Sequence, residues 1–194
     1  MTTEKLGEVV EASTASFTVH CHKLGEPPPL GSLVTVADGD VHIYGVVHNA
    51  TTGSIDPSRK ALALGEELAS AEEVYEEHPE LTKLLRTDFT ALVVGYTCKE
   101  AVRYNLPPRP AKIHGFAHIA SKKESQEFTK GFQFLDVLLN ADAQNRDAAL
   151  AACLRQAAEA QTDKDYLVRA GKELAKLLAQ DSRRLNTILR MMKG

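Results

Sequence analysis

Residues 41–50 read VHIYGVVHNA, and this stretch decides the fold of the first half of the chain. Its residues alternate between two faces: Val41, Ile43, Gly45 and Val47 against His42, Tyr44, Val46 and His48. Alternation of this kind, in a segment rich in Val and Tyr, indicates a half-buried β-strand. The pair Asp38-Gly39 just upstream is typical of a tight hairpin turn. The stretch is therefore predicted to be the second strand of an antiparallel hairpin.

Other short segments on both sides share this character. They are GEVVEA (7–12), SFTVHCHKL (16–24), SLVTVA (32–37), FTALVVGYT (89–97) and a final strand in KIHGFAHIA (112–120). Short strands separated by Gly- and Pro-containing turns favour a small closed antiparallel barrel over a parallel sheet. Apolar residues at helical spacing, near 66–86, predict a helical insertion in which Pro79 ends or kinks the first part.

The period changes after residue 120. SKKE (121–124) is typical of a capping box, in which Ser121 and Glu124 satisfy free backbone groups at a helix start. One apolar stripe follows, made of Phe128, Phe132, Leu135 and Leu139. Further amphipathic helices are expected in 147–161, 162–180 and 181–192. The fold class predicted is α+β: a barrel domain, 1–119, with its helical insertion, followed by a helical bundle domain, 120–194.

Charge is balanced overall but not along the chain. The 194 residues carry a formal net charge of −3, which gives no general attraction to nucleic acid or to an anionic membrane. Seven glutamates and no Lys or Arg lie within 66–80, whereas eight Lys and Arg face three acidic residues within 164–193. These segments are either two solvated helix faces or two patches that meet, within one chain or between subunits.

Nothing in the sequence marks a secreted or membrane-spanning protein. The start of the chain has no basic region followed by an apolar run, and no window approaches the roughly 20 apolar residues of a membrane span. Cys21, Cys98 and Cys153 are far apart, and no CxxC occurs, so neither a zinc ribbon nor a redox motif is indicated. Unpaired cysteines fit a reducing compartment, so a cytoplasmic location is expected.

Motifs for common enzyme chemistry are missing from the sequence. There is no GxxxxGK[ST] loop for a nucleotide phosphate, no GxGxxG for a dinucleotide and no GxSxG nucleophile elbow. No catalytic residue and no cofactor are therefore assigned. A catalytic pair of Cys98 with His114 or His118 requires that separate strands place them together, because nothing local marks a nucleophile.

Four histidines are the weak candidates for a metal site: His20, His22, His114 and His118. On the final strand, His114 and His118 share a face with Phe116, but residues i and i+4 of a strand lie about 13 Å apart, too far to chelate one ion. His20 and His22 have workable spacing, yet three or four ligands must converge for a zinc site. We expect these histidines to lie at the surface or to be hydrogen-bonded, without metal.

A proline-rich stretch, NLPPRP (105–110), joins the two regions of the chain. Its prolines force an extended, stiff backbone. The stretch is either a rigid spacer or part of a contact with another subunit or protein partner, through Pro107, Pro108 and Arg109. A preformed segment loses little entropy on binding, and Arg is enriched at interfaces.

The first third of the chain resembles the HAS-barrel, the small N-terminal barrel of HerA-type ATPases that is related to the N-terminal barrel of ATP synthase catalytic subunits. The elements that match are GEVVEASTASFTV (7–19), LGSLVTV (30–36) and VHIYGVVHNA (41–50). In that family the barrel forms a crown that holds subunits in a ring and docks partners. Family members carry an ATPase domain behind the barrel, where this chain has helices, so no nucleotide-binding residue is carried over.

Three functions remain open at this point. The resemblance implies a non-enzymatic assembly or adaptor module that oligomerises or docks a protein partner. The alternative is a small metal- or flavin-dependent enzyme that uses the histidines of the barrel wall. A nucleic-acid-binding barrel is disfavoured, because the chain has an acidic balance and no strand face rich in basic and aromatic residues.

Overall fold

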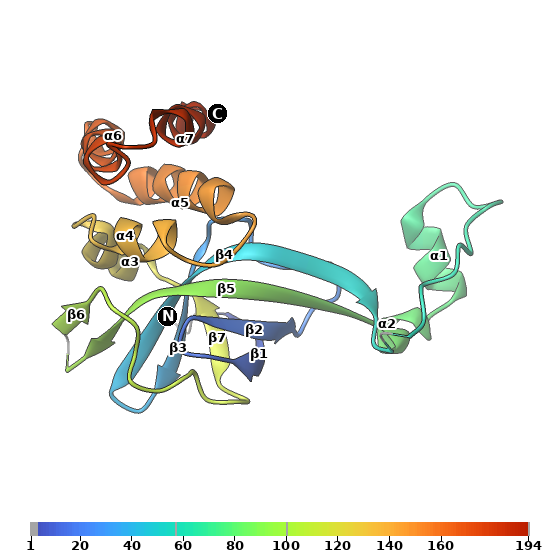
Figure 1. The fold of residues 1–194 in the computed structure, drawn as a ribbon. Helices are drawn as coiled ribbons and strands as arrows, with labels where there is room; N and C mark the ends of the chain where they lie inside the picture. The colour runs from blue at the N-terminus through green and yellow to red at the C-terminus, as the bar shows by residue number, and fades with distance from the viewer. Residues whose placement is uncertain (1–3, 57, 100, 194) are drawn as a thin grey trace.

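A computed structural model describes residues 4–56, 58–99 and 101–193 of the chain. Its strands are β1 (Lys5–Ala12), β2 (Ser16–Cys21), β3 (Leu33–Asp38), β4 (Val41–Ser54), β5 (Leu85–Cys98), β6 (Ala101–Arg103) and β7 (Phe116–Ile119). Six of them close an antiparallel barrel in the order β1-β7-β3-β4-β5-β2, because β2 pairs with both β1 and β5. Strand β6 only extends the sheet beside β5. The predicted barrel is confirmed (Figure 1).

The hairpin of β3 and β4 turns at Gly39 and Asp40, since Asp38 pairs directly with Val41. Gly39 has a φ of +60°, a conformation that glycine adopts without steric cost. The predicted tight turn is therefore present, with the two residues after Asp38 forming its loop.

The part of strand β4 from Ile43 to Val47 is buried on both faces rather than half-buried. Ile43 and Val47 belong to the core inside the barrel, whereas Tyr44 and Val46 belong to a second core that continues into the helices. Strand β5 is buried in the same way: Val93 lies inside the barrel, and Leu92 and Val94 face the helical side. The alternation of residues between two faces is as predicted, but neither face of this part of β4 meets solvent.

Five helices follow the barrel: α3 (Lys122–Thr129), α4 (Phe134–Leu139), α5 (Arg146–Ala160), α6 (Tyr166–Leu177) and α7 (Ser182–Lys193). Helix α5 packs on β4 and on α3, α4, α6 and α7, so it lies at the centre of the helical part (Figure 1). Its alanines allow this close approach from several sides, because they add little bulk between the layers. Helices α6 and α7 form the layer farthest from the barrel.

Two details of the predicted helices change in the structure. The capping box of Ser121 and Glu124 is present, but the stripe that follows is divided between α3 and α4, with a break that contains Gly131. The helix expected to begin at Thr162 begins at Tyr166, with Asp165 as its N-cap residue. Between α3 and α4 the spacing of apolar residues continues through the break, where Phe132 packs against the core without being in a helix. Before Tyr166, by contrast, residues 162–165 are exposed and polar, and the helix begins only with the first buried side chain.

The insertion after β4 projects away from the barrel. Helices α1 (Ala71–Glu77) and α2 (Leu81–Leu84) are short, and Pro79 lies between them, where the sequence predicted an end or a kink. Strands β4 and β5 continue as a two-stranded ribbon to the pair Ser54–Leu85, and residues 55–84, called the arm below, extend from its tip (Figure 1). No helix within the described residues combines the length and apolar character needed to cross a membrane.

Candidate interaction surfaces

The histidines of the barrel wall contact carboxylates or, in one case, a backbone carbonyl oxygen. His20 Nδ1 lies 2.9 Å from Asp88 Oδ1, and Arg86 Nε lies 3.0 Å from the other oxygen of that carboxylate. His118 Nδ1 lies 3.2 Å from the backbone oxygen of Glu4. These contacts join neighbouring strands, as hydrogen-bonded surface histidines do.

Glu8 on β1 lies between two other histidines. His114 Nδ1 lies 3.0 Å from Glu8 Oε2, and His22 Nε2 lies 3.6 Å from Glu8 Oε1. The hydrogen bond from His114 is the main cause that lowers the pKa of Glu8. His114 is not on β7 as expected: it occupies a turn at φ +64°, and the strand begins at Phe116. Across the described residues, no three His, Cys, Asp or Glu side chains are grouped so as to hold a metal ion.

The cysteines divide by burial. Burial raises the pKa of Cys21 to about 11 and that of Cys153 to about 12, so both are protonated thiols inside the two cores. Cys98 lies at the end of β5, opposite Ala101. Within the part of the chain that the structure describes, no hydrogen bond joins it to His114 or His118, whose partners are Glu8 and Glu4.

The arm exposes apolar side chains that a monomer would normally bury. Leu62 is 81% exposed and Leu84 55% exposed, and Ile55 and Leu64 are exposed beside them. These four line one hollow of about 360 Å³ at the tip of the ribbon. Exposed apolar side chains that share one hollow with charged residues, on a segment that projects from the barrel, make this part of the arm a candidate interaction site.

Helix α1 carries half of the acidic residues of the arm: Glu72, Glu73, Glu76 and Glu77. Ser70 caps this helix by accepting a hydrogen bond from Glu73 N, and the Glu73 carboxylate accepts one from Ala69 N. On the exposed side of α1, Glu72 lies three residues before Tyr75 and four before Glu76, so both are its neighbours on the helix surface.

The acidic arm and the basic helices do not meet within one chain. Figure 1 places α1 and α2 at one end of the molecule and α6 and α7 at the other. The intrachain form of the expected patch contact is therefore wrong, because the ribbon holds the arm away from the helices. A contact between subunits stays a prediction.

The proline-rich loop runs from β6 to β7 along the barrel. Pro107 is buried, whereas Pro108 and Arg109 are exposed. Of the three interface candidates, Pro107 anchors the loop to its own chain, and the other two are free to meet another molecule. Their role in a contact stays a prediction.

A groove lies between the outer helices, α6 and α7. Its volume is about 670 Å³, and its walls are mainly apolar: Leu167 and Val168 from α6, and Leu189 and Met192 from α7. Gly171 lines it without a side chain, and Arg190 and Lys193 stand at its border. We call this the α6–α7 groove.

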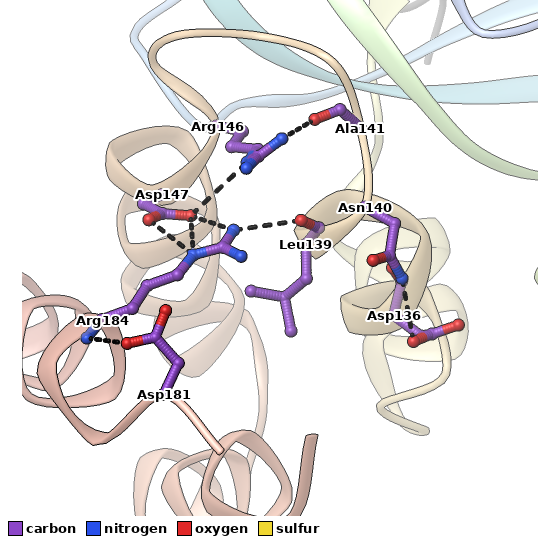
Figure 2. Close-up of polar contacts among 8 residues, drawn as sticks. All are labelled: Asp136, Leu139, Asn140, Ala141, Arg146, Asp147, Asp181 and Arg184. Carbon is purple, nitrogen blue, oxygen red and sulfur yellow. Dashed lines mark hydrogen bonds and ion pairs between the residues drawn. The ribbon is translucent and has the colours of Figure 1, made fainter. Parts of the chain in front are cut away.

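The position of α7 is fixed by an ion-pair clamp (Figure 2). Arg184 Nε lies 2.9 Å from one oxygen of Asp147 on α5, and Arg184 Nη2 lies 2.6 Å from the other. The same Nη2 donates to Leu139 O of α4 at 3.0 Å. Both side chains are mostly buried, and the hydrogen bonds to Asp147 raise the pKa of Arg184. The clamp joins three helices and so holds one wall of the groove.

The sequence analysis did not identify the groove or the exposed leucines of the arm. The spacing of apolar residues in α6 predicts one core stripe, made of Tyr166, Ala170, Leu174, Leu177 and Leu178; all of them are buried except Leu177, which is 43% exposed. Leu167 and Val168 lie off that stripe, and Val168 is 57% exposed, so a second apolar face was the available signal. Leu62 and Leu64 precede the helical insertion expected near 66–86, and their exposure depends on what surrounds them in space.

Comparison with known proteins adds one finding. The family model of the HAS barrel domain matches residues 6–97, from β1 through most of β5. The match ends before β7, which closes the barrel between β1 and β3. No curated protein matches the chain.

Proposed function

Because the N-terminal part of this chain is a HAS barrel domain, we propose that the protein is an assembly module whose copies associate through the arm. HAS barrel domains are often used for assembly or interaction. The observation that carries the proposal is the cluster of Ile55, Leu62, Leu64 and Leu84, exposed together on the projecting arm.

The energetic argument rests on apolar area. Burying an exposed leucine contributes about 1.5–3 kcal/mol, so several such residues at one contact offset much of the cost of association. Each of the six barrel strands is paired on both sides, so the barrel offers no free strand edge. We therefore do not expect two copies to associate by pairing strands of their barrels. The arm, in contrast, extends beyond the barrel and its helices, where a second molecule can reach it.

The decisive experiment removes the arm at its base. Ser54 and Leu85 are paired, so residues 55–84 can be replaced by Asn-Gly, a two-residue hairpin turn, without changing the barrel. Light scattering of the full chain should show a discrete oligomer, and the armless chain should be a monomer with the same strand content by circular dichroism.

Matched substitutions separate the apolar contact from a general effect of charge. Leu62→Asp should shift the chain toward monomer at the same concentration. Ile113→Asp, which changes a residue of comparable class in a turn on the barrel, should leave the oligomer intact. A wild-type chain that stays monomeric at high micromolar concentration would refute the proposal, and so would an oligomer that survives loss of the arm.

A further inference from the structure

We infer that the arm of one copy docks its α1 helix into the α6–α7 groove of a second copy. The inference rests on the proposed self-association and names the surface that receives the arm. It joins two features of the same chain that have no partner within it: an acidic helix at one end and a basic-bordered apolar groove at the other (Figure 1).

The first argument is the fit between apolar surfaces. Tyr75 is exposed on α1, and tyrosine is a favoured anchor at interfaces because it buries a large, rigid ring. Gly171 keeps the groove free of a side chain at this point, because a Cβ there would already contact Leu189 Cδ2 of the opposite wall at 3.4 Å. A volume of about 670 Å³ accommodates an aromatic ring together with neighbouring arm side chains.

The second argument is length. Helix α1 has 7 residues and is therefore about 10 Å long, while α6 and α7 have 12 each and are about 18 Å long. The shorter helix can lie along the groove with its whole exposed face covered.

The third argument is charge complementarity. Helix α7 contains Arg183, Arg184, Arg190 and Lys193 and no acidic residue. Arg184 is committed to Asp147, but among the described residues Arg190 and Lys193 at the groove form no ion pair. Glu72 and Glu76 flank Tyr75 and likewise form none in the described parts of the chain. Docking Tyr75 in the groove brings these carboxylates to the basic border.

The geometry requires a second copy. The ribbon separates the arm from the groove, so one chain cannot fill its own groove. Two different surfaces then meet in each contact, which makes the association head-to-tail. A head-to-tail contact closes into a ring when the rotation between copies permits.

Charge exchange tests the pairing directly. One variant carries Glu72→Lys and Glu76→Lys in the arm, and the other carries Arg190→Glu and Lys193→Glu in the groove. Each variant alone places like charges at the contact, and its dissociation constant should rise at least tenfold by analytical ultracentrifugation. Mixed in equal amounts, the two should assemble again, since each arm then meets a groove of opposite charge.

Two further variants complete the test. Lys122→Glu with Lys123→Glu makes the same charge change on α3, away from the groove, and should leave assembly unchanged. Gly171→Met fills the groove without a change of charge and should weaken assembly. Circular dichroism confirms that each variant is folded.

The outcomes distinguish this inference from the proposed function. Groove variants that assemble like the wild type, in a chain whose armless form is monomeric, would overturn the docking site and leave assembly through the arm standing. Charge variants that weaken assembly but do not complement one another when mixed would also overturn it. A monomeric wild type would refute both.

Discussion

At Gly31 the backbone that leads into β3 lies directly against helix α5. Its φ is +82°, and a Cβ there would come within 2.5 Å of both Ala152 Cβ and Cys153 N. The nitrogen belongs to the backbone of α5, which cannot shift without disturbing the helix. Only glycine therefore lets the barrel and α5 approach this closely.

Gly31→Ala should lower the free energy of unfolding by about 3 kcal/mol, from left-handed strain and overpacking together. Gly25→Ala is the matched control: its φ is +78°, but nothing lies within 4 Å of the added atom, so only the strain of about 1 kcal/mol applies. Urea unfolding measures both. Equal losses at the two positions would show that the contact with α5 contributes nothing.

Among the elements, α7 is held in place by the clamp as well as by its apolar stripe, in which Ile188 and Met192 are buried. Asp147→Ala removes the carboxylate that both Arg184 nitrogens contact and leaves a mostly buried guanidinium with Leu139 O alone. We expect a loss of about 1–2 kcal/mol in the free energy of unfolding, together with faster hydrogen exchange in α7.

The control for this prediction is an exposed ion pair on the neighbouring helix. Glu173→Ala removes the contact with Lys176, whose side chain is 70% exposed, and should cost less than about 0.5 kcal/mol. Suppose instead that Asp147→Ala lowers the free energy of unfolding no more than Glu173→Ala does, and that amide hydrogen exchange in α7 is no faster. The clamp would then contribute nothing to holding α7 in place.

The elements also show how far sequence reasoning reaches. Strands β1 to β5 follow from alternation because each has one face inside the barrel. His114 was misplaced because the alternation in KIHGFAHIA continues through a turn at positive φ, which a pattern of polar and apolar residues does not encode. The arm was recognised as an excursion, but its irregular start and exposed leucines depend on what surrounds them in space.

Across the whole molecule, one apolar cluster joins the barrel to the helices. Phe128 of α3 is fully buried and stacks on Tyr44 of β4, with ring centroids 4.4 Å apart, and it also contacts Phe134 and Tyr104. The expected division at residues 119 and 120 thus separates two folding patterns that share a core. We expect the chain to unfold as one cooperative unit.

Phe128→Ala should reduce the free energy of unfolding by about 3–5 kcal/mol, because it removes a large side chain from a filled core. Hydrogen exchange should lose protection in β1 and β2 as well as in α5, although β1 and β2 lie away from the substitution. Phe116→Ala, at a position 40% exposed on β7, should cost less than about 1 kcal/mol. Loss of protection confined to the helices would indicate two independently unfolding parts.

Of the two irregularities in the pairing of β4 with β5, the one nearer the arm is a bulge in β4. Val47 pairs with Ala91 and Asn49 with Thr90, so His48 is an extra residue in β4 at the point where the ribbon leaves the barrel. Asn49 and the residues after it already pair in register with β5, so a chain without His48 would keep these pairings but lose the local bend and extra twist that a bulge gives to a strand. The bulge lies at the base of the ribbon and the arm at its tip, so a small change of angle at the bulge moves the arm a long way. A length change of one residue, far from the arm, would aim the same acidic helix and the same leucines away from a neighbouring copy while the barrel kept its shape.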